Sequence, residues 1–331
     1  MKIGINGFGR IGRNVVRAIY ERNLENDVEV VAVNDLASSE VNAHLLKYDT
    51  TFGTFSAEVS HDDQSISVDG RKMAFTQHKS PADVPWGDMG VDLVLECSGK
   101  FKDKASLLGH ISGGASKVLA GFPVGDADYT VVYGVNHEGL EDDHKIVSNA
   151  SCTTNCLAPV AKALHDGLGI VNGYMTTIHA YTNDQNLIDK AHKDLYRARS
   201  ATMSMIPTKT GAAAAVGKVL PELAGKIDGL AVRVPTIDVS LVDLVFNAAR
   251  TTSVEEVNSM MEKASETFPG AVLQCNTRPL VSVDFIHNPA SSIFDASQTR
   301  VQGNLVKVMA WYDNEWGFSN RMIDVARLMA D

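Results

Sequence analysis

The chemistry of this chain is expected to centre on Cys152, which lies in the stretch NASCTTNC at residues 149–156. A thiol attacks carbon as its thiolate, and nearby charge sets how much thiolate is present. The residues before Cys152 read as the end of a strand, and those after it as a helix, with Asn149 and Ser151 as candidate N-caps. A thiol in the first helical turn has its thiolate stabilised by the helix dipole and by unpaired N–H groups. This position would favour ionisation of the thiol at rest, as a nucleophile requires.

Three other roles are open to a cysteine here. A metal site would need two further ligands at a recognisable spacing, and the sequence has neither these nor an H-E-x-x-H motif. A disulfide with Cys156 is disfavoured, because helical positions i and i+4 hold their Cβ atoms roughly 5–6 Å apart and a disulfide needs about 3.8 Å. A buried inert thiol is the usual state of free cysteine, and we expect it for Cys97, Cys156 and Cys275. For Cys152, position alone supports the inert and the reactive roles about equally.

A reactive thiol needs a base, and the chain has ten histidines. His179 follows the predicted strand GYMTTI, and active-site residues of sheet proteins often emerge where strands end. For any one of the ten, an exposed or structurally paired histidine is the more common role. His179 is therefore the best candidate base, but spacing alone does not select it.

A second motif, INGFGRIGR, contains Gly7-x-Gly9-x-x-Gly12 between a strand and a helix, and Asp35 follows a second strand 23 residues after Gly12. In a dinucleotide fold the first glycine permits a tight turn, the second admits the pyrophosphate, and the third allows close helix packing. The helix, which starts at Arg10 and Ile11, offers its N–H groups to the phosphates. Asp35 would accept the ribose hydroxyls of NAD and repel the 2′-phosphate of NADP, so we expect NAD. The alternative is a glycine-rich turn without a ligand.

The elements that position these residues fall into two groups. Buried strands at 2–5, 29–34, 91–99, 116–122 and 130–135, with a helix at 10–23, indicate a Rossmann-type, doubly wound, mostly parallel α/β sheet. A helix at 151–167 and strands at 173–181, 229–234, 239–248, 280–285 and 305–312 indicate an α+β domain with a mostly antiparallel sheet. We therefore expect an NAD-binding domain at 1–150 and a catalytic domain at 151–315. A C-terminal helix at about 316–331 could pack back on the first domain.

The overall composition limits the classes of function. The 331 residues carry a formal net charge of −10, which argues against general binding to nucleic acid or anionic membranes. No apolar run approaches the roughly 20 residues of a spanning helix, and the N-terminus lacks the apolar stretch of a signal peptide. Four cysteines are too few for a disulfide scaffold. These features favour a cytoplasmic enzyme without membrane or nucleic-acid partners.

Six stretches together resemble the family of phosphorylating glyceraldehyde-3-phosphate dehydrogenases: INGFGRIGR, SNASCTTNCLAP, TTIHAYTNDQ, TKTGAAAAVGKVLPEL, VRVPT and WYDNEWGFSNR. They occur in the family's order and cover nearly the whole chain. The resemblance implies that Cys152 forms a hemithioacetal and then a thioester with glyceraldehyde 3-phosphate, that His179 is the base, and that inorganic phosphate releases 1,3-bisphosphoglycerate. It also implies a homotetramer, in which the loop at roughly 181–204 packs across a subunit interface.

The resemblance assigns binding roles as well. Arg233 and Thr182 would hold the substrate phosphate, and Asn314 the nicotinamide carboxamide. The attacking phosphate would be held by Ser151, Thr153, Arg197, Thr210 and Gly211. Further contacts to NAD are expected from Lys79, Ser98, Gly99 and Gly121.

Three positions depart from the family's common pattern. Gly121 stands where a hydroxyl residue is frequent, Lys79 where an arginine is frequent, and Phe318 where a tyrosine is frequent. These changes affect the expected affinity for NAD more than the reaction. The nearest alternative is erythrose-4-phosphate dehydrogenase, but Thr182 and the pair Thr210-Gly211 favour the triose substrate. A binding protein with a redox-sensing thiol is an alternative of another class.

Overall fold

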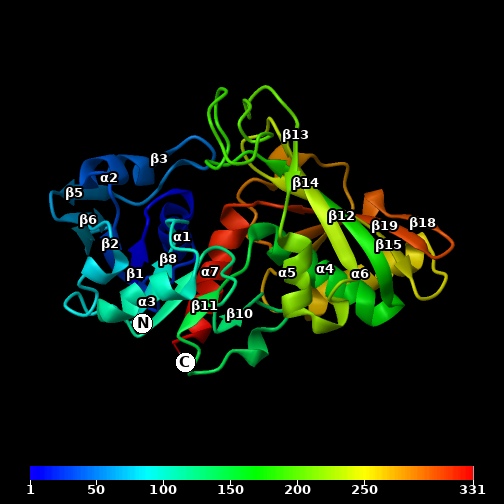
Figure 1. The fold of residues 1–331 in the computed structure, drawn as a ribbon, viewed down its shortest axis with the longest axis horizontal. Coiled ribbons are helices and arrows are strands. Elements are labelled where there is room, and N and C mark those ends of the chain that lie inside the picture. Colours follow the sequence, from blue (N-terminus) through cyan, green and yellow to red (C-terminus); the bar gives the residue numbers. More distant parts are fainter. Residues whose placement is uncertain (331) are drawn as a thin grey trace. The chain divides into compact units, whose positions relative to one another are not determined.

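The computed structural model describes residues 1–330, which divide into two compact units (Figure 1). The first comprises residues 1–131, 137–151 and 319 onward, and the second comprises 132–136 and 152–318. The first unit carries a mostly parallel sheet of the Rossmann type and the second a mostly antiparallel sheet, so the predicted fold class is confirmed. No helix among the described residues is both long enough and apolar enough to cross a membrane.

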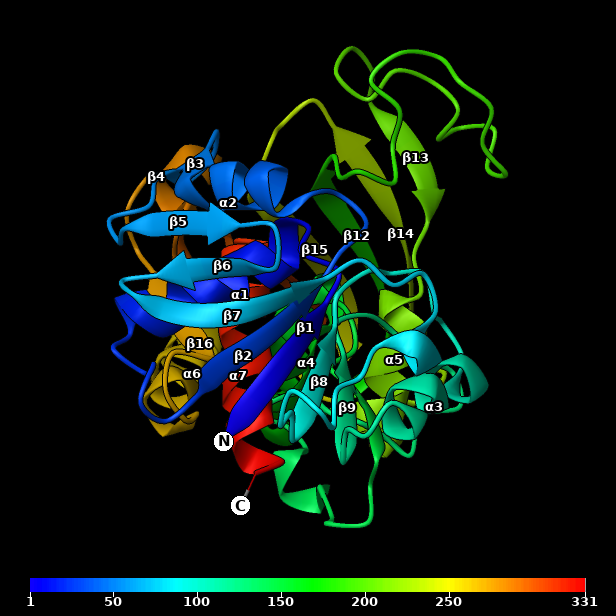
Figure 2. The same cartoon turned by 90° about the vertical axis from the view of Figure 1, so that its left-hand side faces the viewer.

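The sheet of the first unit has the order β10-β11-β9-β8-β1-β2-β7-β6-β5 (Figure 2). All neighbours from β10 to β7 run parallel, and β6 and β5 extend the edge as antiparallel strands. Because the carboxyl ends of the parallel strands share one edge, the turns after β1 and β2 come together there. The strands are β1 (Lys2–Asn6), β2 (Glu29–Asn34), β5 (Val59–Asp62), β6 (Ser65–Val68), β7 (Arg71–Thr76), β8 (Leu93–Glu96), β9 (Lys117–Ala120), β10 (Tyr129–Thr130) and β11 (Ile146–Ser148). A separate pair joins β3 (Tyr48–Asp49) to β4 (Gly53–Thr54), and the helices are α1 (Arg10–Glu21), α2 (Ser39–Lys47) and α3 (Lys104–Ser112).

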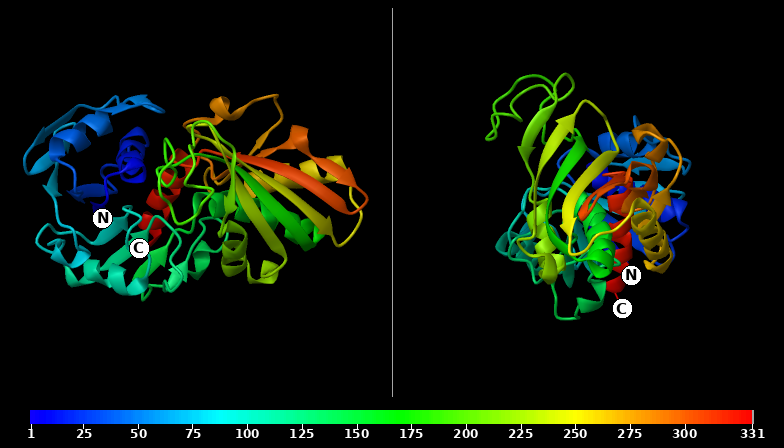
Figure 3. Two further views of the ribbon diagram at one scale, coloured as in Figure 1. Left: turned by 45° about the horizontal axis from the view of Figure 1, so that its top comes forward. Right: turned by 90° about the vertical axis from the view of Figure 1, so that its right-hand side faces the viewer.

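The second unit has a sheet of order β13-β14-β12-β15-β19-β17-β16, with β18 paired to β19 (Figure 3). Helix α4 packs on β12, β15, β17 and β19 and also contacts α5 and α6, so the helices cover one face of the sheet. The strands are β12 (Ile170–Ala180), β13 (Ile206–Lys209), β14 (Ile227–Val234), β15 (Ser240–Ala248), β16 (Leu273–Asn276), β17 (Ser292–Asp295), β18 (Arg300–Gln302) and β19 (Leu305–Tyr312). The helices are α4 (Cys152–Leu168), α5 (Ala212–Val219) and α6 (Val254–Thr267).

Two expected strands are wrong. Residues 131–135 follow the short β10 as a turn, in which Val135 and Asn136 both donate their N–H groups to the carbonyl of Val132 and Gly134 has φ +84°. Residues Ser282–Phe285 form a short 3₁₀ helix, because Asp284 folds back and accepts the N–H of Val281. In both places local hydrogen bonds replace the ladder that the apolar pattern predicted.

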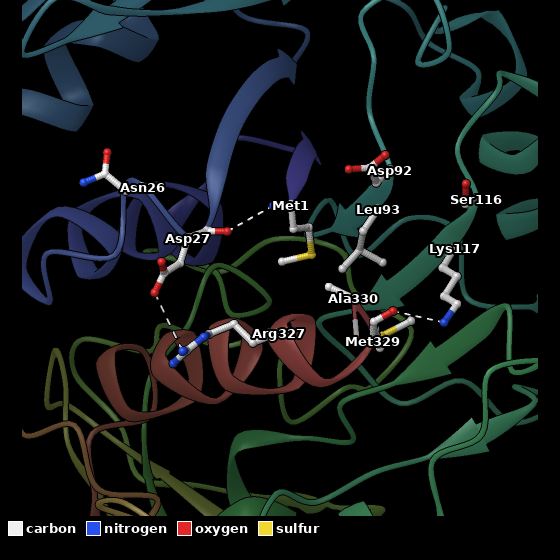
Figure 4. Close-up of a pocket in the computed structure, with 10 residues that line it drawn as sticks. All are labelled: Met1, Asn26, Asp27, Asp92, Leu93, Ser116, Lys117, Arg327, Met329 and Ala330. Atoms are coloured by element: carbon white, nitrogen blue, oxygen red, sulfur yellow. Dashed lines mark hydrogen bonds and ion pairs between the residues drawn. The ribbon is translucent and has the colours of Figure 1, made fainter.

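The C-terminal helix α7 (Trp316–Leu328) has its residues from Ser319 onward in the first unit. Arg22, directly after α1, donates to Asp324 at 2.8 Å, and Lys117 donates to the carbonyl of Met329 at 3.0 Å. Lys117 and Met329 line a cavity of about 750 Å³ at the amino ends of β1, β8 and β9 (Figure 4). Its cations already have partners, since Arg327 lies 3.7 Å from the carboxylate of Asp27 and Lys117 is bonded to Met329. Since the amino ends of the strands line this cavity, it lies at the opposite edge of the sheet from the glycine-rich turn.

Candidate active site

Cys152 is the first residue of α4, as the sequence predicts. The chain turns sharply just before it, because Ala150 is fully buried and has φ +54°. A left-handed conformation costs an alanine roughly 1–2 kcal/mol, so the surrounding structure must enforce it. The strained turn directs the chain from β11 into the helix and leaves the first N–H groups of α4 around the sulfur.

His179 lies at the end of β12, and its Nε2 atom is 3.6 Å from the Sγ atom of Cys152. Its other ring nitrogen, Nδ1, lies 2.6 Å from the carbonyl oxygen of Ala180. A carbonyl accepts only, and that of Ala180 is closer to Nδ1 than the guanidinium of Arg233 is, so we assign the proton to Nδ1 and the free electron pair to Nε2. The imidazole is 4 % exposed. This arrangement lets Nε2 receive the proton of the thiol.

Arg233 lies on β14 directly beside His179, because the two residues are register partners in the parallel β12–β14 pair. Its Nη1 atom is 3.1 Å from the carbonyl of Ala180 and 3.0 Å from Nδ1 of His179. Its buried Nε atom has no hydrogen-bond partner among the described residues. An unsatisfied buried guanidinium donor beside a nucleophile is suited to a phosphate oxygen.

The charge states differ from the expectation of a thiolate at rest. Burial raises the pKa of Cys152, and the charge of Arg233 opposes this rise without cancelling it. Burial, together with the charges of Arg233 and Arg197, lowers the pKa of His179 to about 3. Both shifts favour a neutral thiol and a neutral imidazole, against the resting thiolate that the position of Cys152 predicts. Desolvation outweighs the helix dipole here, which leaves the thiol proton to be transferred as the sulfur attacks.

Tyr312, at the end of β19, supports the site and was not identified from the sequence. Its hydroxyl lies 2.8 Å from that of Thr153 and 2.9 Å from that of Thr177. Its ring meets the His179 ring edge-on with centroids 5.9 Å apart. The tyrosine thus fixes α4 relative to β12. The only signal in the sequence was its place in the motif WYDNEWG.

The predicted phosphate ligands are distributed around this centre. Thr153 is 4 % exposed, its hydroxyl is bonded to Tyr312, and its backbone N–H is directed at the sulfur of Cys152. Arg197 lies in the loop between β12 and β13, where it bonds Asp184 and donates to Thr208 at 2.9 Å. A phosphate at Arg197 would therefore compete with a carboxylate.

The remaining predicted ligands lie at loop ends and helix starts. Thr182 receives the N–H of Asp184 at 3.4 Å, and the hydroxyl of Thr210 accepts the N–H of Ala212 at 3.2 Å. Gly211 precedes α5, and a Cβ atom there would meet no atom within 4 Å. Ser151 directly precedes Cys152 in the chain. The grouping of these residues into one phosphate site stays a prediction.

Asn314 follows β19 and its amide orientation is fixed. Its Oδ1 atom accepts the hydroxyl of Ser240 at 2.7 Å, and the same hydroxyl oxygen accepts the N–H of Ala180 at 3.1 Å. The amide nitrogen of Asn314 therefore points away from Ser240 as a donor. A carboxamide oxygen is a suitable acceptor for it.

The three glycines of the first motif have different surroundings. Gly7 has φ +88°, and a Cβ atom there would lie 2.5 Å from the backbone of Ser98. A Cβ atom at Gly12 would lie 2.5 Å from the carbonyl oxygen of Gly7. At Gly9 it would meet nothing within 4 Å. Gly7 and Gly12 thus allow the close packing, and the open space over Gly9 fits a pyrophosphate at the start of α1.

A cavity of about 250 Å³ opens beside this turn. Five predicted cofactor residues line it: Gly7, Gly9, Asp35, Lys79 and Ser98. Arg10, Ile11, Gly12, Gly99, Gly121 and Asn314 are not among its lining residues, and Arg10 instead forms an ion pair with Asp49. Asn6 and Asn34 line the cavity and were missed, although each ends a parallel strand, a position that often binds ligands.

Asp35 has a second role in this turn. One carboxylate oxygen accepts the N–H of Phe8 at 2.8 Å, and the other accepts the N–H of Ala37 at 2.9 Å. The oxygen bonded to Ala37 also faces the amide of Asn42 at 3.5 Å, so the oxygen bonded to Phe8 is the one that keeps an electron pair for a ribose hydroxyl. The residues present therefore fit NAD, with a carboxylate for the ribose and an open glycine turn for the phosphates.

Comparison with known proteins agrees with both groups of residues. Residues 1–104 match the family described as glyceraldehyde 3-phosphate dehydrogenase, NAD binding domain, and residues 151–314 match its C-terminal domain. A glyceraldehyde-3-phosphate dehydrogenase of Pseudomonas aeruginosa is 62% identical over 330 residues, covering 100% of this chain and 98% of that protein. The chromosomal protein of the same name from Cupriavidus necator is 60% identical over 100% of this chain and 98% of its own length. A relative from Cereibacter sphaeroides is 55% identical over 99% of this chain and 98% of its own length.

Proposed function

Because the chain belongs to the glyceraldehyde 3-phosphate dehydrogenase family, we propose that it oxidises D-glyceraldehyde 3-phosphate with NAD and inorganic phosphate to 1,3-bisphosphoglycerate. The observation that carries the mechanism is the 3.6 Å approach of Nε2 of His179 to the sulfur of Cys152. An aldehyde does not release hydride readily, whereas its tetrahedral thiol adduct does.

The first step joins the sulfur of Cys152 to the aldehyde carbon, while the thiol proton passes to Nε2 of His179 and then to the aldehyde oxygen. The N–H groups at the start of α4 stabilise the developing negative charge on that oxygen. His179 next removes the hydroxyl proton of the hemithioacetal, and the loss of hydride from the same carbon leaves the thioester. Bound NAD supplies the hydride acceptor. Phosphate then attacks the thioester carbon, and the sulfur leaves and regains its proton from His179.

Arg233 holds the substrate phosphate in this mechanism. Its unsatisfied Nε atom and its place beside His179 support the assignment. Arg197, with the backbone at the start of α4 and at Gly211, binds the attacking phosphate. Thr182, Thr210 and Ser151 supply hydroxyl groups to these two sites, in keeping with their positions in the family's motifs.

Cys152→Ala tests the mechanism. We expect NADH production to fall about 10⁴-fold or more, because no other group can form the thioester. Binding of NAD, measured by calorimetry, is expected to stay unchanged. Retained turnover in this variant would refute the thiol mechanism. The kcat/KM for erythrose 4-phosphate should be at least tenfold lower than that for the triose phosphate. The opposite ranking would make erythrose 4-phosphate the preferred substrate.

The chain also acts as a cytoplasmic homotetramer in this proposal. Six large apolar side chains are exposed in or beside the loop between β12 and β13 (Figure 2), which is more than a solvated loop normally carries: Leu187, Ile188, Leu195, Tyr196, Met203 and Met205. Sedimentation velocity should give a mass close to four chains. A monomer at micromolar concentration would contradict the assembly.

A further inference from the structure

A chain of buried hydrogen bonds runs beneath the NAD cavity, with Glu96 at its centre. Glu96 ends β8 and is 0 % exposed. Its Oε2 atom receives the side-chain N–H of Asn6 at 2.5 Å and faces Nε2 of His110 at 3.0 Å. Its Oε1 atom receives the backbone N–H of Ser98 at 2.7 Å. Asn6 and Ser98 both line the cavity, so two walls of the cavity are tied to one carboxylate.

The protonation of the pair Glu96–His110 follows from a third residue. The indole N–H of Trp86 donates to Nδ1 of His110 at 2.9 Å. An indole nitrogen donates only, so Nδ1 must be an acceptor and the ring proton lies on Nε2. Nε2 therefore donates to Glu96. All three partners of the Glu96 carboxyl group are then donors, and the group is an ionised carboxylate that only accepts.

The chain continues from Asn6 to the other wall of the cavity. Because the amide nitrogen of Asn6 donates to Glu96, its oxygen is left to accept from Asn34 at 2.8 Å. The amide nitrogen of Asn34 also donates to the carbonyl of His78 at 3.0 Å, and its oxygen accepts the N–H of His78 and the hydroxyl of Thr76, each at 2.8 Å. The segment that contains His78 and Lys79 lines the cavity. The backbone of His78 thus fixes the amide of Asn34, and Glu96 and Asn34 together fix that of Asn6.

From these contacts we propose that Glu96 is a positioning residue of the NAD site, which holds Asn6, Asn34, His78 and Ser98 in the geometry that the cofactor binds. An ionised carboxylate buried without a cationic partner costs folding free energy. An apolar residue would pack at this place without that cost. The carboxylate therefore contributes by holding the surrounding polar groups in position. The buried charge also acts locally, since burial and the Glu96 charge raise the pKa of Cys97 and keep that thiol neutral.

Glu96→Gln tests this role with almost no change in shape. The amide has one acceptor oxygen where the carboxylate has two, so one or two of the three donors lose their partner, depending on the orientation of the amide. The loss of a charged hydrogen bond predicts a KM for NAD about tenfold higher. The kcat at saturating NAD should stay within about twofold, because Glu96 touches neither Cys152 nor substrate. An unchanged KM would overturn the inference, as would equal losses in KM and kcat.

Two controls separate this role from general destabilisation and from the assignment of the cavity. Ile66→Val removes a methylene group from the buried strand β6 and should lower stability slightly with no change in the KM for NAD. Asp35→Ala should weaken NAD binding at least tenfold, because the inference depends on the proposed binding of NAD beside Asp35. If Asp35→Ala weakens binding and Glu96→Gln does not, only the inference on Glu96 fails. If neither variant changes binding, the cavity is not the NAD site.

A measurement on the unaltered protein covers the case in which Glu96→Gln does not fold. Nitrogen-15 shifts of labelled histidine distinguish the two neutral tautomers of His110, and the His110→Gln variant identifies its signals. We expect the ring proton of His110 on Nε2. A proton on Nδ1 with Nε2 unprotonated would mean that Glu96 is not the acceptor at the centre of the chain.

Discussion

Replacing Arg233 with glutamine should make His179 a markedly stronger base. The Nη1 atom of Arg233 lies 3.0 Å from Nδ1 of His179, and its charge is the largest cause after burial that lowers the pKa of the imidazole to about 3. Glutamine keeps an amide donor close to the carbonyl of Ala180 but removes the charge. The pKa of His179 should therefore rise toward its ordinary value.

The size of the change follows from Coulomb's law. Two unit charges about 5 Å apart at an effective dielectric constant of about 20 repel each other by roughly 3 kcal/mol. Since one pKa unit corresponds to about 1.4 kcal/mol, the pKa of His179 should rise by roughly 2 pH units. It should stay below the ordinary value of 6.5, because the ring remains buried.

Carbon-13 spectra of protein labelled at histidine Cε1 can follow this titration, and the signal that disappears in His179→Asn identifies the residue. Arg199→Gln is the matched control, because Arg199 lies in the same unit, pairs with Asp189 at 2.7 Å and is 68% exposed. It removes the same charge and should leave the titration of His179 unchanged. A rise of less than about half a pH unit in Arg233→Gln, or an ordinary pKa for His179 in the unaltered protein, would refute the electrostatic reasoning. Binding of a substrate phosphate should raise the pKa of His179 in the unaltered protein, because it neutralises the same charge.

Two further predictions concern stability. The pKa of His179 is lowered in the folded protein to about 3 from the ordinary 6.5, so between these values the unfolded chain binds a proton that the folded one does not. Stability is therefore lost as pH falls from 6.5 toward 3. Between pH 7 and pH 5, the free energy of unfolding of His179→Asn, measured by urea denaturation, should fall by about 2 kcal/mol less than that of the unaltered protein. Equal losses would contradict the buried neutral imidazole. Tyr312→Phe removes the hydrogen bonds to Thr153 and Thr177. It should lower the free energy of unfolding by about 1–3 kcal/mol and leave the affinity for NAD unchanged. Thermal stability equal to that of the unaltered protein would show that the hydroxyl contributes nothing.

The elements that sequence reasoning predicts correctly here are those with strong local patterns. Long apolar runs placed β12, β15 and β19 within a few residues of their observed bounds. The start of α4 at Cys152 was predicted from the change of pattern and the candidate caps. The pairing of Cys152 with His179 was only one of ten options by position and became specific through the family's motifs. Local patterns therefore locate elements, whereas they do not decide which elements meet.

The features that were missed depend on the folded environment. The resting thiolate was expected from the helix dipole, a local effect, but burial by the folded chain has the larger influence on the pKa of Cys152. Tyr312 has its role because β19 brings its hydroxyl between two threonines that are distant in sequence. Glu96 falls within the buried strand predicted at 91–99, where the sequence assigns it no function. Its role becomes visible only when Trp86, His110 and Asn6 are found around it.

The two backbone hydrogen bonds that the Asp35 carboxylate accepts have a consequence for protein engineering. The carboxylate that favours NAD also holds the N–H of Phe8, which lies between the first two glycines of the turn. A small apolar substitute, chosen to admit the extra phosphate of NADP, would release that N–H and loosen the loop that cradles the pyrophosphate. A successful redesign of coenzyme preference must therefore restore an acceptor for Phe8 along with any new arginine, and single replacements at this position should yield catalysts that use both coenzymes poorly.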